Sequence, residues 1–291
     1  MITSTAALSQ TKSVSLNGIN RARKRSPWLL LLTAAVTLMG CSNSDTPEDA
    51  AASAQAASDA TGGEVLRIGT EGAYAPFNYT NTDGSLGGFD VEIAHALCED
   101  MGMTCEIIAQ DWDGIIPGLK AGKYDAIVAA MSVTPERAEQ VRFTQPYFSN
   151  TLVFLAKEES DFDPSRPNDI TSNTIAAQRS TISSQWLEGE YPKADMKLYD
   201  TLSNAFLDLG SGRVDVMISD KLPAIQWLSA PSNRGYEVKG DEIDINDDFA
   251  IAVRPDDEAL QAKLDQSLAS IKANGTFDAI NERYFAVPAS E

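Results

Sequence analysis

The sequence predicts an α/β protein of two lobes, each built on its own mainly parallel sheet flanked by helices. From about residue 64, short apolar runs alternate with amphipathic helical patterns, which is typical of strand-helix-strand units. The alternation breaks once, at a polar, Pro-containing passage over 160–173, and then restarts. A length of 291 residues with 43% apolar residues gives room for two lobes, each with a core.

The first half of the folded region contains the elements expected of one lobe. Apolar runs predict strands at Val65–Thr70, Cys105–Gln110, Asp125–Ala130 and 151–159. Apolar residues at helical spacing predict helices at Asp90–Met101 and Gly114–Ala121. Thr134 and Pro135 open a further helix, in the N-cap and first-turn positions.

The second half repeats the pattern and then becomes helical. Strands are predicted at Thr174–Gln178, Met196–Tyr199, Val214–Ser219 and 249–253. Helices are predicted near Ser183–Glu190, at Leu202–Gly210 and Pro223–Leu228, and at about Asp257–Ala273 and Thr276–Arg283. Together the two halves supply enough strands and helices for two α/β lobes, each with its own sheet.

Residues 1–40 are predicted to be a lipoprotein signal peptide. A basic cluster of Arg21, Arg23, Lys24 and Arg25 precedes an uncharged run from Trp28 to Gly40, which is too short to span a bilayer comfortably. The run ends in "LMGC", which resembles a bacterial lipobox, with Cys41 as the lipidated new N-terminus; a simple signal peptide with an incidental Cys is the alternative. The small, polar residues after it cannot bury enough surface to fold, so we expect 41–63 to be a flexible tether. The expected location is periplasmic or on the cell surface, anchored to the membrane through the lipid, with the choice of inner or outer membrane open.

Charge and cysteine content narrow the partners. The chain has 23 basic and 42 acidic residues, a net charge of −19, which disfavours binding to nucleic acid or to an anionic membrane surface. With one His in the chain, a metal site is not expected. If Cys41 is lipidated, Cys98 and Cys105 remain, and a turn at Gly102 could bring them together. Export supplies an oxidising compartment, so we expect a disulfide, with two separate core thiols as the alternative.

Polar side chains follow the predicted strands at the point where each one ends. In open parallel sheets, ligands bind outside the carboxyl ends of the strands. The residues found there carry both charges, hydroxyl groups and aromatic rings: Glu71, Tyr74, Asp111, Trp112, Asp113, Ser132, Arg137, Arg179, Ser180, Thr181 and Asp220. This set suits a small zwitterion better than a phosphate or a sugar.

Arg137 is the most informative of these residues. It falls in the first turn of the helix that Thr134 opens, where the helix dipole disfavours a cation. A cation there is expected if an anion joins it, and Arg offers a bidentate fork for a carboxylate. The alternative is a solvated surface Arg paired with Glu136 or Glu139.

Asp220 would complement Arg137 by holding an α-ammonium group. On its own it could equally be a helix N-cap, and the same alternative applies to Asp90 and Asp113. Trp112 could be packed in the core or exposed to a ligand.

These residues belong to a larger resemblance. From about Leu66 to Phe285 the chain resembles the periplasmic amino-acid-binding proteins of ABC importers, the family 3 solute-binding proteins, and among them the lysine/arginine/ornithine and histidine binders. The joint pattern is highly specific, although none of its pieces is so alone. The motifs are "IGTEGAYAPFNY", "GGFDVEIAHALCEDM", "DWDGIIPGLKAGKYDAIVAAMSVTPERAEQVRFTQPYF" and "NGTFDAINERYF".

The resemblance implies a role for each candidate residue. Arg137 would bind the ligand α-carboxylate with Ser132, Thr181 and backbone groups around Ala130, and Asp220 would bind the α-ammonium. Tyr74 and Trp112 would enclose the ligand side chain, while Glu71 would reach its distal end, with Asp90 nearby. Cys98 and Cys105 match a disulfide of the basic-amino-acid subgroup. The resemblance implies no catalytic residue, metal or cofactor.

The implied fold is the type II periplasmic-binding-protein fold. The implied function is that of a monomer that delivers an L-amino acid to the membrane permease subunits of an ABC importer. Crossovers near 149–153 and 241–249 would act as hinges. Lobe 1 would comprise 64–150 and 249–288, and 151–248 would form the inserted lobe 2. Closure around the ligand would then be recognised by the importer.

Some residues depart from the basic-amino-acid pattern. Ala129 and Ala130 stand where such binders usually carry serines, and Ile182 is apolar at a position that is often polar. An acidic residue at the Glu71 position also occurs in cystine- and glutamine-type binders. The sequence therefore favours arginine, lysine or ornithine, with cystine, glutamine or another polar amino acid as the alternative. A periplasmic dehydratase of the cyclohexadienyl type and an amino-acid sensor are further alternatives.

Overall fold

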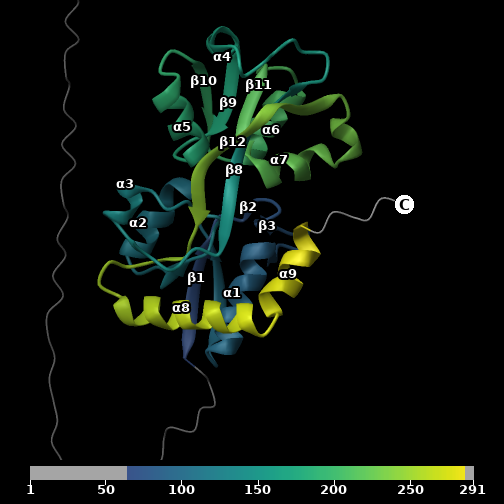
Figure 1. Cartoon of the computed structure of the whole chain (residues 1–291). Helices are drawn as coiled ribbons and strands as arrows, with labels where there is room; N and C mark the ends of the chain where they lie inside the picture. Colours follow the sequence, from purple (N-terminus) through teal and green to yellow (C-terminus); the bar gives the residue numbers. More distant parts are fainter. Residues whose placement is uncertain (1–63, 286–291) are drawn as a thin grey trace, which may run out of the picture. The chain divides into compact units, whose positions relative to one another are not determined.

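The computed structural model describes residues 64–285, all within one unit, Asp59–Glu291 (Figure 1). The predicted signal peptide, Cys41 and the predicted tether lie outside the described residues.

The first lobe is organised by a five-stranded sheet in the order β5-β1-β6-β13-β7. Its strands are β1 (Val65–Thr70), β5 (Thr104–Ala109), β6 (Ala126–Ile127), β7 (Arg142–Phe143) and β13 (Ala252–Val253). The central β1 pairs in parallel with β5 and with β6, while β13 is antiparallel to β6 and β7.

The second lobe has its own five-stranded sheet in the order β10-β9-β11-β8-β12. Its strands are β8 (Phe148–Lys157), β9 (Thr174–Gln178), β10 (Asp195–Tyr199), β11 (Val216–Asp220) and β12 (Tyr236–Phe249). β9 pairs in parallel with β10 and β11, and β8 is antiparallel to β11 and β12.

Both sheets are mixed rather than mainly parallel, which corrects the sequence prediction. Within each, the parallel pairs join strands that are linked through helices, as strand-helix-strand connections require. The antiparallel pairs involve β8 and β12, which carry the chain between the lobes, and β13, which follows the second of these crossovers.

Two long strands, β8 and β12, run side by side between the lobes (Figure 1). β8 passes without a break through the predicted boundary at 150/151, and β12 through the one at 248/249. The exact lobe boundaries therefore stay a prediction.

Helices flank both sheets (Figure 1). In the first lobe these are α1 (Phe89–Asp100), α2 (Ile115–Lys120), α3 (Pro135–Ala138), α8 (Glu258–Ala273) and α9 (Thr276–Phe285), with a 3-10 turn η1 at Trp112–Gly114. In the second lobe they are α4 (Pro167–Ser172), α5 (Ile182–Glu190), α6 (Leu202–Gly210) and α7 (Lys221–Leu228), with η2 at Pro231–Asn233.

Several elements were not predicted. A small sheet of β2 (Ala73–Tyr74), β3 (Asn78–Thr80) and β4 (Leu86–Gly87) forms after β1. These strands are too short for an apolar alternation to show. α4 lies within the polar passage 160–173, where a Pro at the first helical position is its main signal. Much of β12 is rich in Asp, Asn and Gly, residues that are depleted in strands, and pairing with β8 overrides that preference.

An aromatic cluster ties the crossovers to the first lobe. Phe148 and Phe249 face each other in the β8–β12 register, with ring centroids 5.9 Å apart. Phe77 packs edge-on against both, at 5.2 and 5.4 Å. The ring centroid of Phe285 in α9 lies 4.9 Å from that of Phe89 in α1. Since these rings are core groups, the turn after β1 and the base of both crossovers share one support.

Cys98 and Cys105 form a disulfide. The bond links the end of α1 to β5, with a left-handed Gly102 (φ 66°) between them. It lies in the first lobe and joins elements that are close in sequence.

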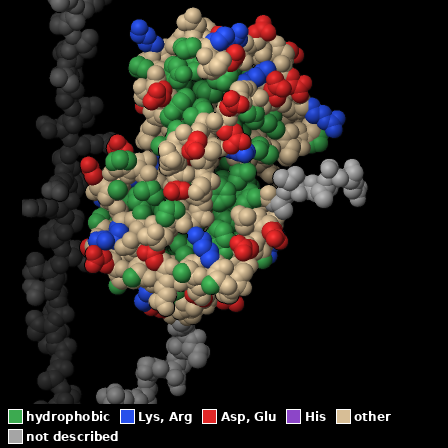
Figure 2. Space-filling model, viewed as in Figure 1, with side chains coloured by type: hydrophobic (Ala, Val, Ile, Leu, Met, Phe, Trp, Pro, Cys, Tyr) green, Lys and Arg blue, Asp and Glu red, His purple; other side chains and the backbone are tan. Residues whose placement is uncertain are grey.

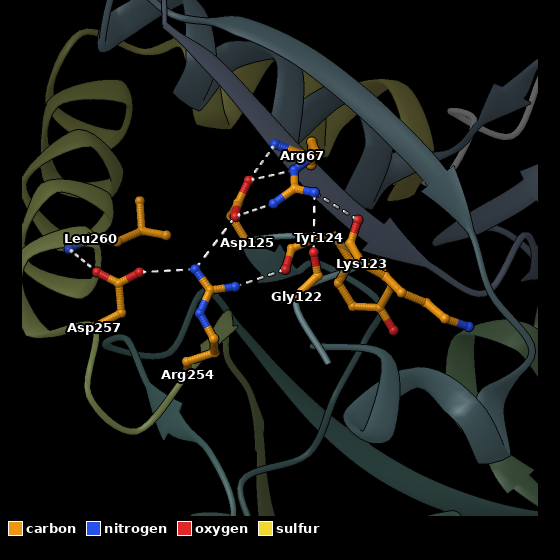
Figure 3. A network of polar contacts seen from close by, with 8 residues as sticks. All are labelled: Arg67, Gly122, Lys123, Tyr124, Asp125, Arg254, Asp257 and Leu260. Carbon is orange, nitrogen blue, oxygen red and sulfur yellow. Dashed lines mark hydrogen bonds and ion pairs between the residues drawn. The ribbon is translucent and has the colours of Figure 1, made fainter. Parts of the chain in front are cut away.

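A polar network centred on Asp125 lies in the first lobe (Figure 3). Asp125 accepts hydrogen bonds from Arg67 Nε at 3.0 Å and Nη2 at 2.8 Å, and from Arg254 Nη2 at 3.4 Å. Arg254 in turn contacts Asp257, whose carboxylate accepts from Leu260 N and so caps α8. The network thus connects β1 to the segment that follows β13.

Acidic side chains are spread over both lobes on the face shown in Figure 2. Within residues 64–285, none of the helices is long and apolar enough to cross a membrane.

Candidate functional site

A small cavity lies between the two lobes, at the ends of their strands. Its volume of about 10 Å³ has room for about one water molecule, so an amino acid needs the lobes further apart. The lining residues are Glu71, Tyr74, Trp112, Ala129, Ala130, Ser132, Arg137, Gln178, Thr181, Ile182 and Asp220. Of the nine residues to which the resemblance gives a ligand-binding role, Asp90 alone is missing from this wall. Four further residues of the strand-end set also lie outside it: Asp111, Asp113, Arg179 and Ser180.

The turn after β1 brings Glu71 and Tyr74 to the cavity. Gly72 makes this turn in the left-handed region (φ 75°), and its N–H donates to Asn78 Oδ1 at 2.8 Å. A Cβ on Gly72 would lie 2.9 Å from a methyl group of Leu86, so a larger residue would have to move that side chain and would also be strained at this φ. The glycine therefore sets the direction of both side chains.

Arg137 is buried at one end of the cavity, with 6% of its surface exposed. Thr134 caps its helix, as predicted, by accepting from Arg137 N. The guanidinium donates to Ser132 O at 2.8 Å and to Ser180 O at 3.0 Å, and it lies 5.2 Å from the Trp112 ring centroid. Its burial excludes the alternative of a solvated surface Arg.

The electrostatics at Arg137 favour an incoming anion. Burial lowers the pKa of Arg137 from its ordinary value, while the carboxylates of Asp247 and Asp220 act in the opposite direction. A ligand carboxylate would offer the guanidinium an ionised, bidentate acceptor in place of the neutral carbonyls that it contacts in this structure.

Asp220 lies in the second lobe and is 3% exposed. Its carboxylate accepts from the Tyr74 hydroxyl across the cleft. It stands at the N-cap position of α7, but its side chain makes no capping hydrogen bond. Burial raises its pKa to about 7, an effect that the Tyr74 hydrogen bond reduces and the Asp247 charge increases.

Glu71 meets Gln178 at another point of the cavity wall. Gln178 Nε2 donates to Glu71 Oε1 at 2.7 Å, which bridges the lobes. Burial raises the pKa of Glu71 to about 7, with the Gln178 bond opposing and the charges of Asp111 and Asp113 adding to the shift. Gln178 was not predicted as a site residue, although a polar side chain that ends an apolar strand was a usable signal.

Asp90 lies apart from the cavity. It is fully buried, and its oxygens accept from the Tyr147 hydroxyl at 2.7 Å and from Asn78 Nδ2 at 2.9 Å. The helix N-cap is Gly88, so Asp90 does not cap α1. Since both oxygens serve buried partners, Asp90 supports the wall through Asn78 rather than forming it.

The remaining wall is partly apolar. Thr181 donates to Gln178 O at 2.8 Å and caps α5, so its hydroxyl proton is used within the second lobe. Ala129, Ala130 and Ile182 add no side-chain hydrogen bonds, as their replacement of polar residues predicts. Trp112 Nε1 donates to Ser180 O at 3.1 Å and thereby closes the cleft beside Arg137.

Comparison with known proteins agrees with this geometry. The family described as bacterial extracellular solute-binding proteins, family 3, matches residues 66–287. ABC transporter arginine-binding protein 1 of Escherichia coli K12 is 34% identical over 228 residues, which cover 78% of this chain and 93% of that protein. The lysine/arginine/ornithine-binding periplasmic protein of the same organism is 28% identical over 228 residues, which cover 76% and 88%.

A solved structure shows the same fold. An ancestral arginine-binding protein bound to arginine superposes with a TM-score of 0.72 at 33% identity, covering 76% of this chain and 98% of that one. The fold is therefore that of the type II periplasmic binding proteins, with two lobes joined by crossovers. The chain belongs to family 3 of the bacterial extracellular solute-binding proteins.

Proposed function

We propose that this protein captures a basic L-amino acid, namely arginine, lysine or ornithine, and delivers it as a monomer to the permease subunits of an ABC importer. Periplasmic amino-acid binding is common to its relatives. The cationic specificity is the finer part of the proposal.

The observation that carries the proposal is the charge pattern of the cavity wall. One guanidinium, Arg137, is present with two carboxylates, Glu71 and Asp220. An α-amino acid would place its carboxylate on Arg137 and its ammonium group on Asp220. Glu71 then remains for a second cationic group on the ligand side chain.

Buried acceptor atoms support the same ligand class. Among residues 64–285, Asp220 Oδ1 and Gln178 Oε1 are buried side-chain oxygens without a hydrogen-bond partner. Leaving such atoms unpaired costs about 1–3 kcal/mol each. A ligand with an α-ammonium group and a guanidinium or ammonium side chain supplies the donors that both oxygens lack.

Isothermal titration calorimetry against a panel of amino acids tests the specificity. We expect heat of binding with L-arginine, L-lysine or L-ornithine, and much weaker binding of D-arginine because its ammonium group would miss Asp220. Binding to cystine or glutamine, with no heat from any basic amino acid, would contradict the specificity while leaving the α-amino-acid site intact.

We also propose that Cys41 is lipidated and anchors the protein to the membrane. Support comes from the "LMGC" sequence after the uncharged run, and Cys41 lies outside the described residues. Labelled palmitate fed to cells should be incorporated into the wild-type protein but not into Cys41→Ser, which should leave the membrane fraction. An unlabelled wild-type protein would favour the simple signal peptide.

A further inference from the structure

Asp247 is a buried carboxylate on the second crossover, outside the cavity wall. It is 5% exposed and pairs with Asn150 of β8 in the strand register. The register shifts between Ile243 and Asp247, and Asn246 in this stretch is left-handed (φ 52°). Irregularities of this kind redirect side chains near functional sites. Here the side chain of Asp247 is buried and contacts Ser132, a residue of the cavity wall.

Both hydrogen bonds to Asp247 end on the same oxygen. Asn150 Nδ2 donates to Oδ2 at 2.8 Å, and the Ser132 hydroxyl contacts Oδ2 at 3.2 Å. An ionised carboxylate offers only acceptor atoms, so Ser132 is the donor of the second hydrogen bond. A hydroxyl has a single proton to donate. Ser132, which lines the cavity, therefore has only lone pairs left for a ligand.

The charges around Asp247 favour the binding of a ligand ammonium group near Asp247 and Asp220. Burial raises the pKa of Asp247, the hydrogen bonds from Asn150 and Ser132 and the charge of Arg137 act in the opposite direction, and the charge of Asp248 adds to the rise. Asp247 in turn acts on Asp220 as a second negative charge. An ammonium group bound at Asp220 would relieve this repulsion between two buried carboxylates.

We propose that Asp247 is a positioning residue of the ammonium end: by taking the Ser132 proton it makes the Ser132 hydroxyl an acceptor for the α-ammonium of the ligand. The inference rests on the proposed amino-acid binding. It differs from the expectation that Ser132 helps Arg137 to hold the α-carboxylate, because a hydroxyl committed to Asp247 cannot donate to that carboxylate.

The first test compares three variants by calorimetry with L-arginine. Asp247→Ala frees the Ser132 proton, so we expect at least about a tenfold loss of affinity. Asp247→Asn keeps an acceptor oxygen and should retain most of the affinity. Asp248→Ala is the matched control, since Asp248 is adjacent but accepts from Ser149 Oγ, and it should bind like the wild type. Unchanged binding by Asp247→Ala overturns the proposal.

The second test separates positioning from general damage to the fold. We would measure 5-guanidinopentanoate, which is arginine without its α-ammonium group. The preference for arginine over this analogue should shrink by the same factor in Asp247→Ala, in Ser132→Ala and in the double variant. Equal loss of affinity for both ligands, or effects that add in the double variant, would overturn the proposal.

Two further outcomes are decided in advance. If Asp247→Ala does not fold, Asp247→Leu, which is of similar size and has no acceptor oxygen, replaces it in the same comparison with Ser132→Ala. If the wild-type protein binds no basic amino acid, the proposed specificity fails. The same comparison is then made with the amino acid that it does bind and the corresponding analogue without the α-ammonium group.

Discussion

Replacing Glu71 with Gln should stabilise the protein while removing its affinity for a basic amino acid. The side chain is buried, and burial raises its pKa from 4.5 to about 7. Gln keeps the size of the side chain and an oxygen that can accept from Gln178 Nε2. The variant therefore removes the charge and retains the contact between the lobes.

The magnitude follows from the difference between the folded and unfolded pKa values. A folded-state pKa near 7 against 4.5 in the unfolded chain means that the folded protein holds a proton that the unfolded chain releases. Stability from this proton is complete below pH 4.5 and is lost as the pH rises through 7. At 1.36 kcal/mol per pKa unit, the wild type loses about 3 kcal/mol relative to Glu71→Gln by pH 8.

Urea denaturation without ligand at pH 4, 6 and 8 measures this difference. We expect similar stability of both proteins at pH 4, an advantage for Glu71→Gln of about 2 kcal/mol at pH 6 and about 3 kcal/mol at pH 8. Calorimetry of the same samples should show the loss of arginine binding. A variant no more stable than the wild type at pH 8, or one equally stabilised at all three pH values, would refute the argument.

Three further predictions concern the site and its support. Arg137→Gln should lower the affinity for an amino acid at least about a hundredfold by calorimetry, because the buried ligand carboxylate then lacks its partner. Arg179 is half-exposed and paired with Asp200, so Arg179→Gln is the control and should change the affinity little. Equal losses in both variants would contradict the assignment of Arg137 to the ligand carboxylate. In the double variant Cys98→Ser/Cys105→Ser, the free energy of unfolding measured in urea should fall by about 2–3 kcal/mol, since the disulfide closes a short loop in the first lobe. The variant should bind arginine normally. Asp125→Asn should lower stability by about 1 kcal/mol at pH 7, because the ion pairs with Arg67 and Arg254 lower the folded-state pKa of Asp125 below 3.8. The deficit should shrink as the pH falls from 3.8 toward that lower pKa, and a deficit as large at pH 2 as at pH 7 would contradict this.

Much of the site was predictable because it lies where strands end. Glu71, Tyr74 and Asp220 follow strands whose apolar runs are clear in the sequence, and parallel strands bring their carboxyl ends to one edge. Thr134 and Pro135 locate the helix that carries Arg137, through capping chemistry that is purely local. Such signals need no knowledge of the tertiary structure.

The parts that escaped prediction depend on pairing between distant segments. β12 forms because β8 lies beside it, and its own residues disfavour a strand, so the position of Asp247 could not be inferred. Gln178 was assigned to the strand that it ends, and only the packing of the lobes shows that it meets Glu71. Asp90 is a carboxylate of the kind expected in a binding site, yet both of its oxygens accept hydrogen bonds from Tyr147 and Asn78.

The buried carboxylates of the cleft connect stability to specificity. Burial raises the pKa of both Glu71 and Asp220 to about 7, so each is only partly ionised near neutral pH. A cation brought to either group returns the charge that burial opposes, and it gains more than it would from a carboxylate in water. A neutral ligand side chain gains no such attraction when the carboxyl group loses its proton. The free energy that the fold gives up at Glu71 would thus be recovered only by a ligand that carries a positive charge to it, so we expect the same burial that weakens the protein to favour arginine over glutamine.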